Sequence, residues 1–384
     1  MTYDYIFCGF GLSSMLILLE LQKTGSMGEK RILVLEKDKD TQEKTWSFWE
    51  RGKGEFDDLL DGSWSSGHFT APGLTTEILG EYTYKSLRRS ALSAFVLKRL
   101  SLLESVRFER AEVLSWADDG LGVTVRTNGP TYRTKKYFHS APPDLASLGK
   151  KILLQHFIGW NIRTEQNHFE PVAEIMDFDV PQHDNTRFFY VLPSTNRSAL
   201  VEYTLFSSHL LSESEYEDEI KQYLLRRGIV NYEIVSKERG VVPMTTYPFW
   251  KRNTRNVLHI GTAGGWTKAS TGYTFYNAQK LSARLVRSLL DGNADFRKFF
   301  RKDRFYWYDA ILIEVLCFKN DAGREIFTRL FKNNRPGRVL RFLNEATHWT
   351  EELSIVKSCP KWLFFRGLAH IIAKRGTPRP PNYN

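Results

Sequence analysis

The chain has 384 residues, of which 42% are hydrophobic and 26% are charged, so it can form one two-lobed domain or two closely packed ones. Its formal net charge of +10 suits a nucleic acid or an anionic membrane surface. No Lys/Arg run and no nucleic-acid-binding motif occurs, so we expect no nucleic-acid partner. The oligomeric state stays open.

The cysteines Cys8, Cys317 and Cys359 are far apart and lack the spacing of metal ligands. This pattern predicts a reducing, cytosolic compartment and no metal site. The chain opens directly with a strand-like run, which predicts that no signal peptide is present. No apolar stretch reaches the roughly 18 residues that a membrane span requires. Aromatic residues make up 14% and suit either a large core or a tunnel for a flat, apolar or cation-forming substrate.

The N-terminal residues predict the crossover unit of a parallel sheet, with a buried strand at 3–10, an apolar helix at 12–24 and a second buried strand at 31–36. Residues 51–80 are rich in Gly and Ser and predict loops. Further along, the patterns predict a helix at 84–103, strands at 106–112, 122–127 and 131–139, several strands within 153–202 including a hairpin closed by "TNR", a helix at 213–227, a strand at 257–261, a helix at 274–290, a basic helical region to about 376, and a disordered tail.

A glycine-rich loop joins the first strand to the first helix. Gly9 permits a tight turn, and Gly11 lets the backbone approach a pyrophosphate. The third position of such loops requires a small side chain, and Ser14 is small although it departs from the usual Gly or Ala. Glu36 ends the second strand, where an acidic side chain accepts hydrogen bonds from ribose hydroxyls and repels a 2′-phosphate. The pattern predicts a dinucleotide other than NADP; the alternative is a structural turn of similar sequence.

A second glycine-rich segment, His259–Phe275, again follows a buried strand and precedes a helix. Two such loops favour a two-part flavoprotein in which both contact FAD, whereas the alternative is two unrelated loops at the ends of the sheet. Arg89, in a basic pair at 88–89, is a candidate for contact with the pyrophosphate or flavin, or a solvated side chain. The glycines that we expect at the cofactor in this segment are Gly261, Gly264, Gly265 and Gly272.

Four stretches give the chain a specific resemblance to bacterial lycopene cyclases, the β-cyclase type of FAD-binding carotenoid enzymes. Weaker similarities are "QHFIGW", "EIMDF" and "GVVPM", and together the matches run in order from residue 3 to about 280. The four stretches are "YDYIFCGFGLSSMLILLEL", "KTWSFW" at Lys44–Trp49, "LVEYT" at Leu200–Thr204 and "GTAGGWTKASTGYTF" at Gly261–Phe275.

The resemblance implies that the protein folds the ψ-ends of lycopene, and of other ψ-end carotenoids, into β-ionone rings. It implies bound FAD in reduced form, NADPH as reductant and no net redox change. The implied fold is a Rossmann-type FAD-binding α/β fold of the two-lobed, hydroxylase-like type, with an antiparallel-sheet substrate lobe and a helical C-terminal part. The expected division is an FAD lobe at about 1–50, 84–150 and 250–295, a substrate lobe at about 51–83 and 151–249, and a helical, membrane-facing part at 296–376.

Cyclisation requires an acid that protonates a terminal C=C bond, and an apolar site enables a carboxyl group to serve by raising its pKa. Glu202 is the only acid in an apolar strand, and alternation places it on the same face as Leu200 and Thr204. Without the resemblance, a surface glutamate on an edge strand would be the simpler interpretation. The second Glu of the family's box is Tyr203 here, which should face away from Glu202.

A second departure concerns the His-Pro that many relatives carry before "STGY", where this chain has Lys268 and Ala269. Lys268 is a candidate to hold a phosphate, a flavin carbonyl or a partner carboxylate, or it is simply exposed. Aromatic faces stabilise carbocations without trapping them. The aromatic candidates to line the substrate site, each of which is also a plausible packing residue, are Trp46, Phe48, Trp49, Trp160, Trp266 and Tyr273.

The segment "KWLFFRGLAHIIAKR" resembles an amphipathic helix that lies in a membrane interface. From Lys361 to Asn384 the chain holds five Lys/Arg and no Asp/Glu, which favours anionic headgroups. We therefore expect a cytoplasmic protein, peripheral on the inner face of the cell membrane; a last helix packed on the core is the equal alternative. A second apolar segment at 305–316 more closely fits the core.

Two other functions fit the same sequence patterns. One is an FAD-dependent isoprenoid or aromatic monooxygenase or reductase, which would change the mass of its substrate. The other is a non-catalytic protein that binds a carotenoid or flavin. The sequence leaves open whether one or both ends of lycopene are cyclised and whether Glu202 or the reduced flavin donates the proton.

Overall fold

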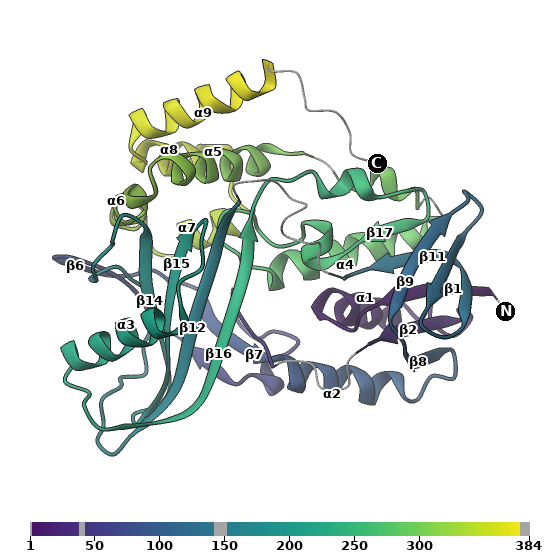
Figure 1. Cartoon of the computed structure of the whole chain (residues 1–384), viewed down its shortest axis with the longest axis horizontal. Helices are drawn as coiled ribbons and strands as arrows, with labels where there is room; N and C mark the ends of the chain where they lie inside the picture. The colour runs from purple at the N-terminus through teal and green to yellow at the C-terminus, as the bar shows by residue number, and fades with distance from the viewer. Residues whose placement is uncertain (1, 38–42, 142–151, 293, 301, 377–384) are drawn as a thin grey trace.

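The computed structural model describes residues 2–37, 43–141, 152–292, 294–300 and 302–376. A mostly parallel sheet (sheet A) and a large, mostly antiparallel sheet (sheet C) lie side by side, and a small sheet (sheet B) lies between them. The C-terminal helices form a layer across one end of the molecule, at the top of Figure 1. The expected α/β class and helical C-terminal part are confirmed.

Sheet A carries the N-terminal crossover unit that the sequence predicts. Its order is β8-β2-β1-β11-β10-β9, with β17 paired to β11, and β8, β2, β1, β11 and β17 run parallel. Helices α1 and α4 pack against each other beside the sheet. The elements are β1 (Thr2–Cys8), α1 (Leu12–Lys23), β2 (Ile32–Glu36), α2 (Arg89–Leu100), β8 (Val106–Arg110), β9 (Val113–Asp118), β10 (Val123–Thr127), β11 (Thr131–His139), β17 (Val257–His259) and α4 (Phe275–Leu290).

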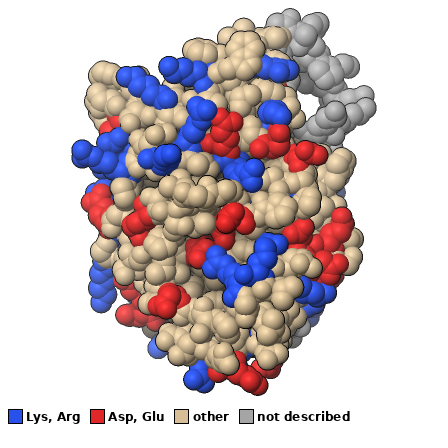
Figure 2. Space-filling view, turned by 90° about the vertical axis from the view of Figure 1, so that its left-hand side faces the viewer, with Lys and Arg blue, Asp and Glu red and all other residues tan. Residues whose placement is uncertain are grey.

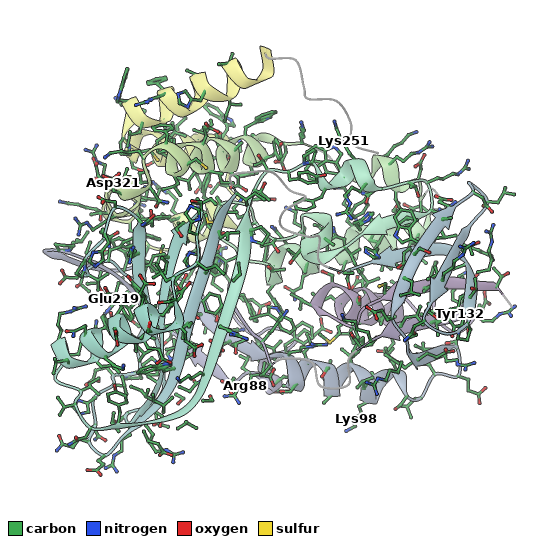
Figure 3. The ribbon with its side chains drawn as sticks, in the orientation of Figure 1. Arg88, Lys98, Tyr132, Glu219, Lys251 and Asp321 are labelled. Atoms are coloured by element: carbon green, nitrogen blue, oxygen red, sulfur yellow. The ribbon has the colours of Figure 1, made fainter. Side chains whose placement is uncertain are left out.

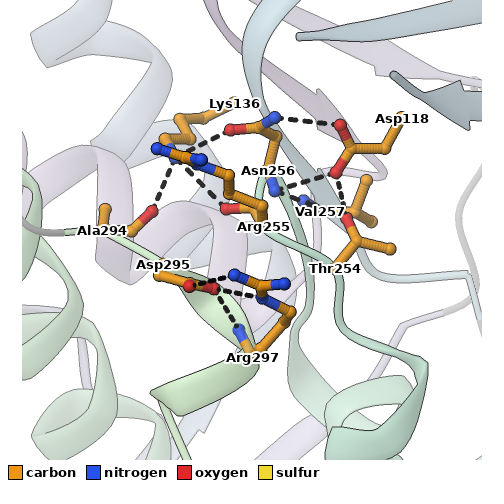
Figure 4. Close-up of polar contacts among 9 residues, drawn as sticks. All are labelled: Asp118, Lys136, Thr254, Arg255, Asn256, Val257, Ala294, Asp295 and Arg297. Atoms are coloured by element: carbon orange, nitrogen blue, oxygen red, sulfur yellow. Dashed lines mark hydrogen bonds and ion pairs between the residues drawn. The ribbon is translucent and has the colours of Figure 1, made fainter. Parts of the chain in front are cut away.

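Strand β17 joins sheet A from a distant part of the sequence, and a polar network holds it there (Figure 4). The carboxylate of Asp118 on β9 accepts hydrogen bonds from the backbone N–H and the side-chain amide of Asn256, at 3.0 and 2.9 Å. The ammonium group of Lys136 on β11 donates to Asn256 Oδ1 at 2.9 Å and to the carbonyl of Ala294 at 2.6 Å. These bonds fix the strand that leads into the second glycine-rich loop.

Sheet C has the order β16-β12-β15-β14-β13-β5-β6. Strands β14 and β15 form the predicted hairpin, and the predicted helix at 213–227 is α3 (Glu213–Arg226), which covers one face of the sheet. The other face points toward sheet B and the C-terminal helices. The strands are β5 (Gly67–Ala71), β6 (Leu74–Glu77), β12 (Leu153–Thr164), β13 (Ala173–Asp177), β14 (Thr186–Thr195), β15 (Ser198–Ser207) and β16 (Tyr232–Met244).

Sheet B corrects two predictions. It consists of β3 (Thr45–Glu50), β7 (Thr83–Arg88) and β4 (Gly62–Trp64), so residues 84–88 form a strand rather than the start of a helix. Burial explains the difference, since the ammonium group of Lys85 is enclosed and bonds Glu50 and Asp57. The region 51–80, predicted as loops, contains β4, β5 and β6, whose pairing partners are mostly distant in sequence.

The C-terminal region is helical, as predicted. Helices α5 and α9 pack against each other, and no helix among the described residues is long and apolar enough to cross a membrane. The tail at 377–384, predicted to be disordered, lies outside the described residues. The helices are α5 (Arg304–Phe318), α6 (Gly323–Lys332), α7 (Arg338–Leu343), α8 (Trp349–Ser358) and α9 (Lys361–Gly376), and the short 3₁₀ turns are η1 (Asp57–Leu59), η3 (Phe249–Arg252), η4 (Gly261–Gly264), η5 (Phe296–Lys298) and η6 (Asn320–Ala322).

Candidate functional site

The first glycine-rich loop leaves β1 and enters α1 directly. Gly9 has a φ of +91°, and a Cβ there would lie 2.3 Å from Ser140 Oγ, so the fold itself requires glycine. Gly11 differs, because an added Cβ would meet no atom within 4 Å. The free backbone N–H groups at the start of α1 lie immediately after Gly11. Open space beside these donors fits the pyrophosphate of a dinucleotide.

Three predicted residues hold this loop in place. Glu36 Oε2 accepts the N–H of Phe10 at 2.7 Å, and Ser14 Oγ donates to the carbonyl of Gly9 at 2.7 Å. The guanidinium group of Arg89 donates to the carbonyl of Phe10 at 3.2 Å and lies 4.0 Å from Glu36. The structure thus brings Gly9, Gly11, Ser14, Glu36 and Arg89 together, as the sequence predicts.

The second glycine-rich loop meets the first one. A Cβ on Gly261 would lie 3.3 Å from Ser13 Oγ at the start of α1, and that hydroxyl is buried with no hydrogen-bond partner. A buried polar group without a partner is typical of a ligand contact. Ser13 was not predicted, because nothing in the sequence distinguishes it from Ser14.

The other glycines of this loop are explained by the chain itself. A Cβ on Gly264 would lie 2.0 Å from the carbonyl of His259, and one on Gly265 would lie 2.8 Å from the Phe249 ring. Gly272 has a φ of +74° and contacts the side chain of Gln155. The structure therefore accounts for these glycines without a ligand, whereas a Cβ on Gly11 would meet no neighbouring atom.

An apolar cavity of about 250 Å³ lies between sheet C and the C-terminal helices. It extends from the side chains of sheet C to α8 and α9 at the surface of the molecule. Nearly all of its lining is aliphatic or aromatic, which suits a hydrocarbon ligand. Residues that line it include Trp49, Gln155, Phe188, Tyr190, Phe206, Tyr273, Phe327, Leu340, Val356, Phe364, Phe365 and Leu368.

Glu202 lies on β15, is 8% exposed and does not itself line the cavity. Its neighbour across the strand pair is Tyr190, which lines the cavity and whose hydroxyl lies 3.2 Å from that of Tyr273. A third tyrosine, Tyr84 of β7, is hydrogen-bonded to Tyr273. The carboxyl group of Glu202 thus lies immediately beyond a cluster of tyrosines.

Burial raises the pKa of Glu202 from its ordinary value of 4.5 to about 8, and the nearby carboxyl group of Glu238 adds to the rise. The hydroxyl of Thr204 donates to Glu202 Oε1 at 2.6 Å, and this hydrogen bond partly opposes the rise in the pKa of Glu202. A carboxyl group with this pKa is protonated at neutral pH and can act as a general acid. Tyr203 faces α3 on the other side of the sheet, as predicted, and accepts a hydrogen bond from Arg187.

The aromatic candidates divide into three groups. Trp49 and Tyr273 line the cavity and meet edge to face with ring centroids 4.6 Å apart. Trp46, Phe48 and Trp266 pack in the core beside sheet A. Trp160 lies beneath α3, on the face of sheet C opposite Glu202, so the structure does not bring it to the site. Strand alternation explains this correction, because Gly159 is opposite Glu202 and Trp160 is therefore on the other face.

Lys268 is buried and its charge is matched by carboxylates. Its ammonium group lies 3.0 Å from Asp309 and 3.5 Å from Glu345, and Asp309 also accepts a bond from Ser270. Lys268 and Trp266 line a second, more polar cavity of about 160 Å³ that is separate from Glu202. Of the roles considered for Lys268, the structure supports the partner carboxylate.

Sequence reasoning missed Glu238, Tyr84 and Tyr190, which surround Glu202. Glu238 lies in the charged run "SKERG", which looks like a solvated strand. One signal was available: Gly159 interrupts a strand-like run, and a glycine in a strand indicates that another group approaches closely.

Comparison with known proteins shows the family of the chain. The family model described as lycopene cyclase protein matches residues 4–368. The chain belongs to the lycopene cyclase family. It is 27% identical over 305 residues to the lycopene beta-cyclase of Pantoea ananas, with 74% of each chain covered. It is 28% identical over 222 residues to the lycopene beta-cyclase of Paracoccus sp. (strain N81106 / MBIC 01143), where the match spans 54% of this chain and 56% of the relative.

Solved structures show the fold of this family member. A geranylgeranyl bacteriochlorophyll reductase-like protein from Thermoplasma acidophilum has a TM-score of 0.67 at 13% identity, with 96% of this chain and 99% of that chain covered. The halogenase PltM, in complex with phloroglucinol and FAD, has a TM-score of 0.60 at 13% identity, with 98% and 93% covered. The predicted flavoprotein fold is confirmed.

The buried state of Glu202 predicts a pH-dependent stability. Because its pKa is raised to about 8 in the folded state, the neutral carboxyl stabilises the fold below pH 4.5, and this contribution is lost as pH rises toward about 8. Glu202→Gln has no carboxyl group to titrate at this position. The free energy of unfolding of the variant minus that of the wild type should therefore increase by up to about 1.4 kcal/mol for each pH unit across this window. Denaturant titrations at several pH values measure the difference; a constant difference would show that Glu202 ionises normally.

Proposed function

We propose that this protein is a lycopene β-cyclase that converts the ψ-ends of lycopene, through γ-carotene, into the β-ionone rings of β-carotene. The observation that carries the proposal is Glu202, an acid held neutral by burial and paired across the strands with Tyr190, which lines the apolar cavity. Family membership and the two lycopene beta-cyclase relatives support the same reaction. The substrate keeps its mass, so the enzyme is an isomerase.

The chemistry follows from the surroundings of the acid. Glu202 transfers its proton to the terminal C=C bond, and the tertiary cation attacks a nearby double bond and closes a six-membered ring. A second tertiary cation then loses a proton. Thr204 donates to Glu202 Oε1, which leaves Oε2 as the oxygen to carry the transferable proton. The rings of Trp49 and Tyr273 offer π-electrons to the cation and hold no strong nucleophile that would trap it.

FAD is the proposed cofactor, and the chain fits it on three observations. Gly11 has open space beside the free N–H groups of α1, Ser13 Oγ is buried without a partner, and Glu36 at the end of β2 lies against the loop, where its carboxylate accepts the N–H of Phe10. When bound in its reduced form, with NADPH as the reductant, FAD would supply negative charge near the cationic intermediate. Gly9, Gly11, Ser14, Glu36, Arg89 and the loop at Gly261 would hold it.

The direct test is expression in a lycopene-accumulating bacterium. We expect β-ring products with the mass of lycopene, and a loss of at least about 100-fold for Glu202→Gln, because the amide cannot donate the required proton. The matched control is Glu233→Gln, an exposed glutamate on β16, which should remain active. Pigment chromatography and mass spectrometry provide the readout.

Other outcomes identify the alternatives. A product of changed mass, with NAD(P)H consumed, would indicate a monooxygenase or reductase. Unchanged lycopene from folded, flavin-containing protein would leave a carotenoid- or flavin-binding protein. Full activity of Glu202→Gln would remove Glu202 from the mechanism.

Flavin binding is tested at Gly11. Since the chain leaves its Cβ position open, Gly11→Val should keep the fold and thermal stability of the flavin-free protein while it blocks the pyrophosphate. Gly28→Val is the control, because Gly28 also has no neighbouring atom within 4 Å and lies in an exposed turn away from the loop. We expect at least about a tenfold loss of FAD affinity for Gly11→Val alone. Flavin absorbance after gel filtration measures it, and equal retention by both variants would contradict the site.

The membrane is the proposed source of the substrate. The cavity reaches the surface at Phe365 and Leu368 of α9, which are 67% and 40% exposed. Trp362 on the same helix is 75% exposed, and Val356 of α8 is 49% exposed. Figure 2 shows the side of the molecule that lies at the left of Figure 1. Lys and Arg side chains occur over the upper part of this side, where the C-terminal helices lie. Exposed apolar side chains with surrounding basic ones suit an anionic bilayer on the cytoplasmic side.

The double substitution Trp362→Ser and Phe365→Ser should reduce binding to vesicles that contain phosphatidylglycerol by at least about fivefold, because it removes the apolar contact. Leu225→Ser, at a 57% exposed position on α3, is the control and should bind as the wild type does. Vesicle sedimentation gives the bound fraction. Unchanged binding of the double variant would contradict α9 as the contact.

A further inference from the structure

A second carboxyl group lies beside the proposed acid, on the opposite side of one glycine. In sheet C, Gly159 of β12 is the register partner of Glu202 on β15 and of Glu238 on β16. Directly opposed residues on neighbouring strands present their side chains to the same face. Both carboxyl groups therefore point toward sheet B, with a residue that has no side chain between them.

The missing side chain of Gly159 leaves the space that the pair uses. A Cβ at this position would lie 2.9 Å from Cδ1 of Leu200, 3.3 Å from Cβ of Glu202 and 3.3 Å from Cγ of Glu238. The φ angle of Gly159 is ordinary, so the backbone does not require glycine here. The crowding of Leu200 and the two glutamates around this position favours it.

The two glutamates differ in their surroundings. Glu202 is buried, whereas Glu238 is half-buried and lies at the edge strand of the sheet. Glu238 Oε2 accepts a bond from Thr45 Oγ1 at 3.4 Å, at the start of the "KTWSFW" segment. Burial raises the pKa of Glu238 as well. The pair thus extends from the buried interior of sheet C to the place where sheet C contacts sheet B.

The charged groups around the pair do not neutralise it. Arg88 at the start of α2 lies between sheets A and C (Figure 3), but its guanidinium group pairs with Asp61 at 2.9 Å. The groups that face the two glutamates from the packed elements are Arg88 and Tyr84 of β7, Tyr190 of β14, Tyr273, Asp61, Glu43, Thr45 and Thr204.

We propose that Glu238 shares a single proton with Glu202 across Gly159 and so keeps Glu202 protonated, as a positioning residue for the reaction. This proposal rests on the proposed cyclase function. The register places the two carboxyl groups on one face of the sheet with a single strand between them, and two buried like charges so placed do not both ionise readily, so one proton stays on the pair. It resides on the more buried Glu202, and Glu238 carries the charge. After Glu202 has protonated the polyene, the partly exposed Glu238 takes a proton from the solvent and passes it to Glu202. The proton that the ring later releases leaves to the solvent, so the cycle consumes no net proton.

The test is the pH profile of cyclisation by the flavin-loaded enzyme. Wild-type activity should fall as pH rises through about 8, where Glu202 ionises. Glu238→Gln removes the neighbouring charge, so the midpoint should move down by about one pH unit. Glu238→Asp retains the charge and should keep a midpoint close to that of the wild type. Glu233→Gln, an exposed glutamate on the same strand, is the control and should not move it.

A second readout does not depend on activity. The pH dependence of unfolding free energy, compared with a Glu202→Gln background, reports the titration of Glu202 directly. The same downward shift in Glu238→Gln is expected there. Unshifted midpoints in both readouts would overturn the role of Glu238, even if Glu202 remains essential. A protein without cyclase activity would refute the proposed function, while the unfolding data would still show whether the two carboxyl groups share a proton.

Discussion

The burial of one carboxyl group, that of Glu202, is the constraint on which the proposed site depends. In water a glutamate is ionised at neutral pH and has no proton to give, whereas burial in β15 raises its pKa to about 8. The cost of enclosing this group is limited because the neutral form is retained and Thr204 bonds one of its oxygens at 2.6 Å. The same burial excludes water, which would otherwise capture a carbocation.

Each part of the fold contributes to that environment. Sheet C presents Glu202, Glu238 and Tyr190 on one face, and sheet B brings Tyr84 and the segment that begins at Thr45 against it. The C-terminal helices enclose the apolar cavity beyond the tyrosines and carry it to the surface. Sheet A joins the two glycine-rich loops, which lie more than 240 residues apart in the sequence, and the Asn256 network fixes the strand that leads into the second loop.

Local patterns were sufficient to predict much of this arrangement. Gly9, Gly11 and Glu36 predicted the dinucleotide loop because its chemistry lies in a short stretch, and alternation in β15 predicted that Tyr203 faces away from Glu202. Residues 84–88 were predicted to be helical because their pairing with β3 and β4 is not visible locally. Trp160 was misplaced and Glu238 was missed for a similar reason: the face that each presents depends on a strand register set by partners across the sheet.

The proposed reaction requires Glu202 to be a neutral carboxylic acid in the folded protein at pH 7. The most direct measurement is the infrared difference spectrum between the wild type and Glu202→Gln at that pH. A carbonyl band of a protonated carboxyl group that is present in the wild type, is absent from the variant and fades as pH rises through about 8 is the predicted result. A carboxylate band assigned to Glu202 at pH 7 would contradict the account.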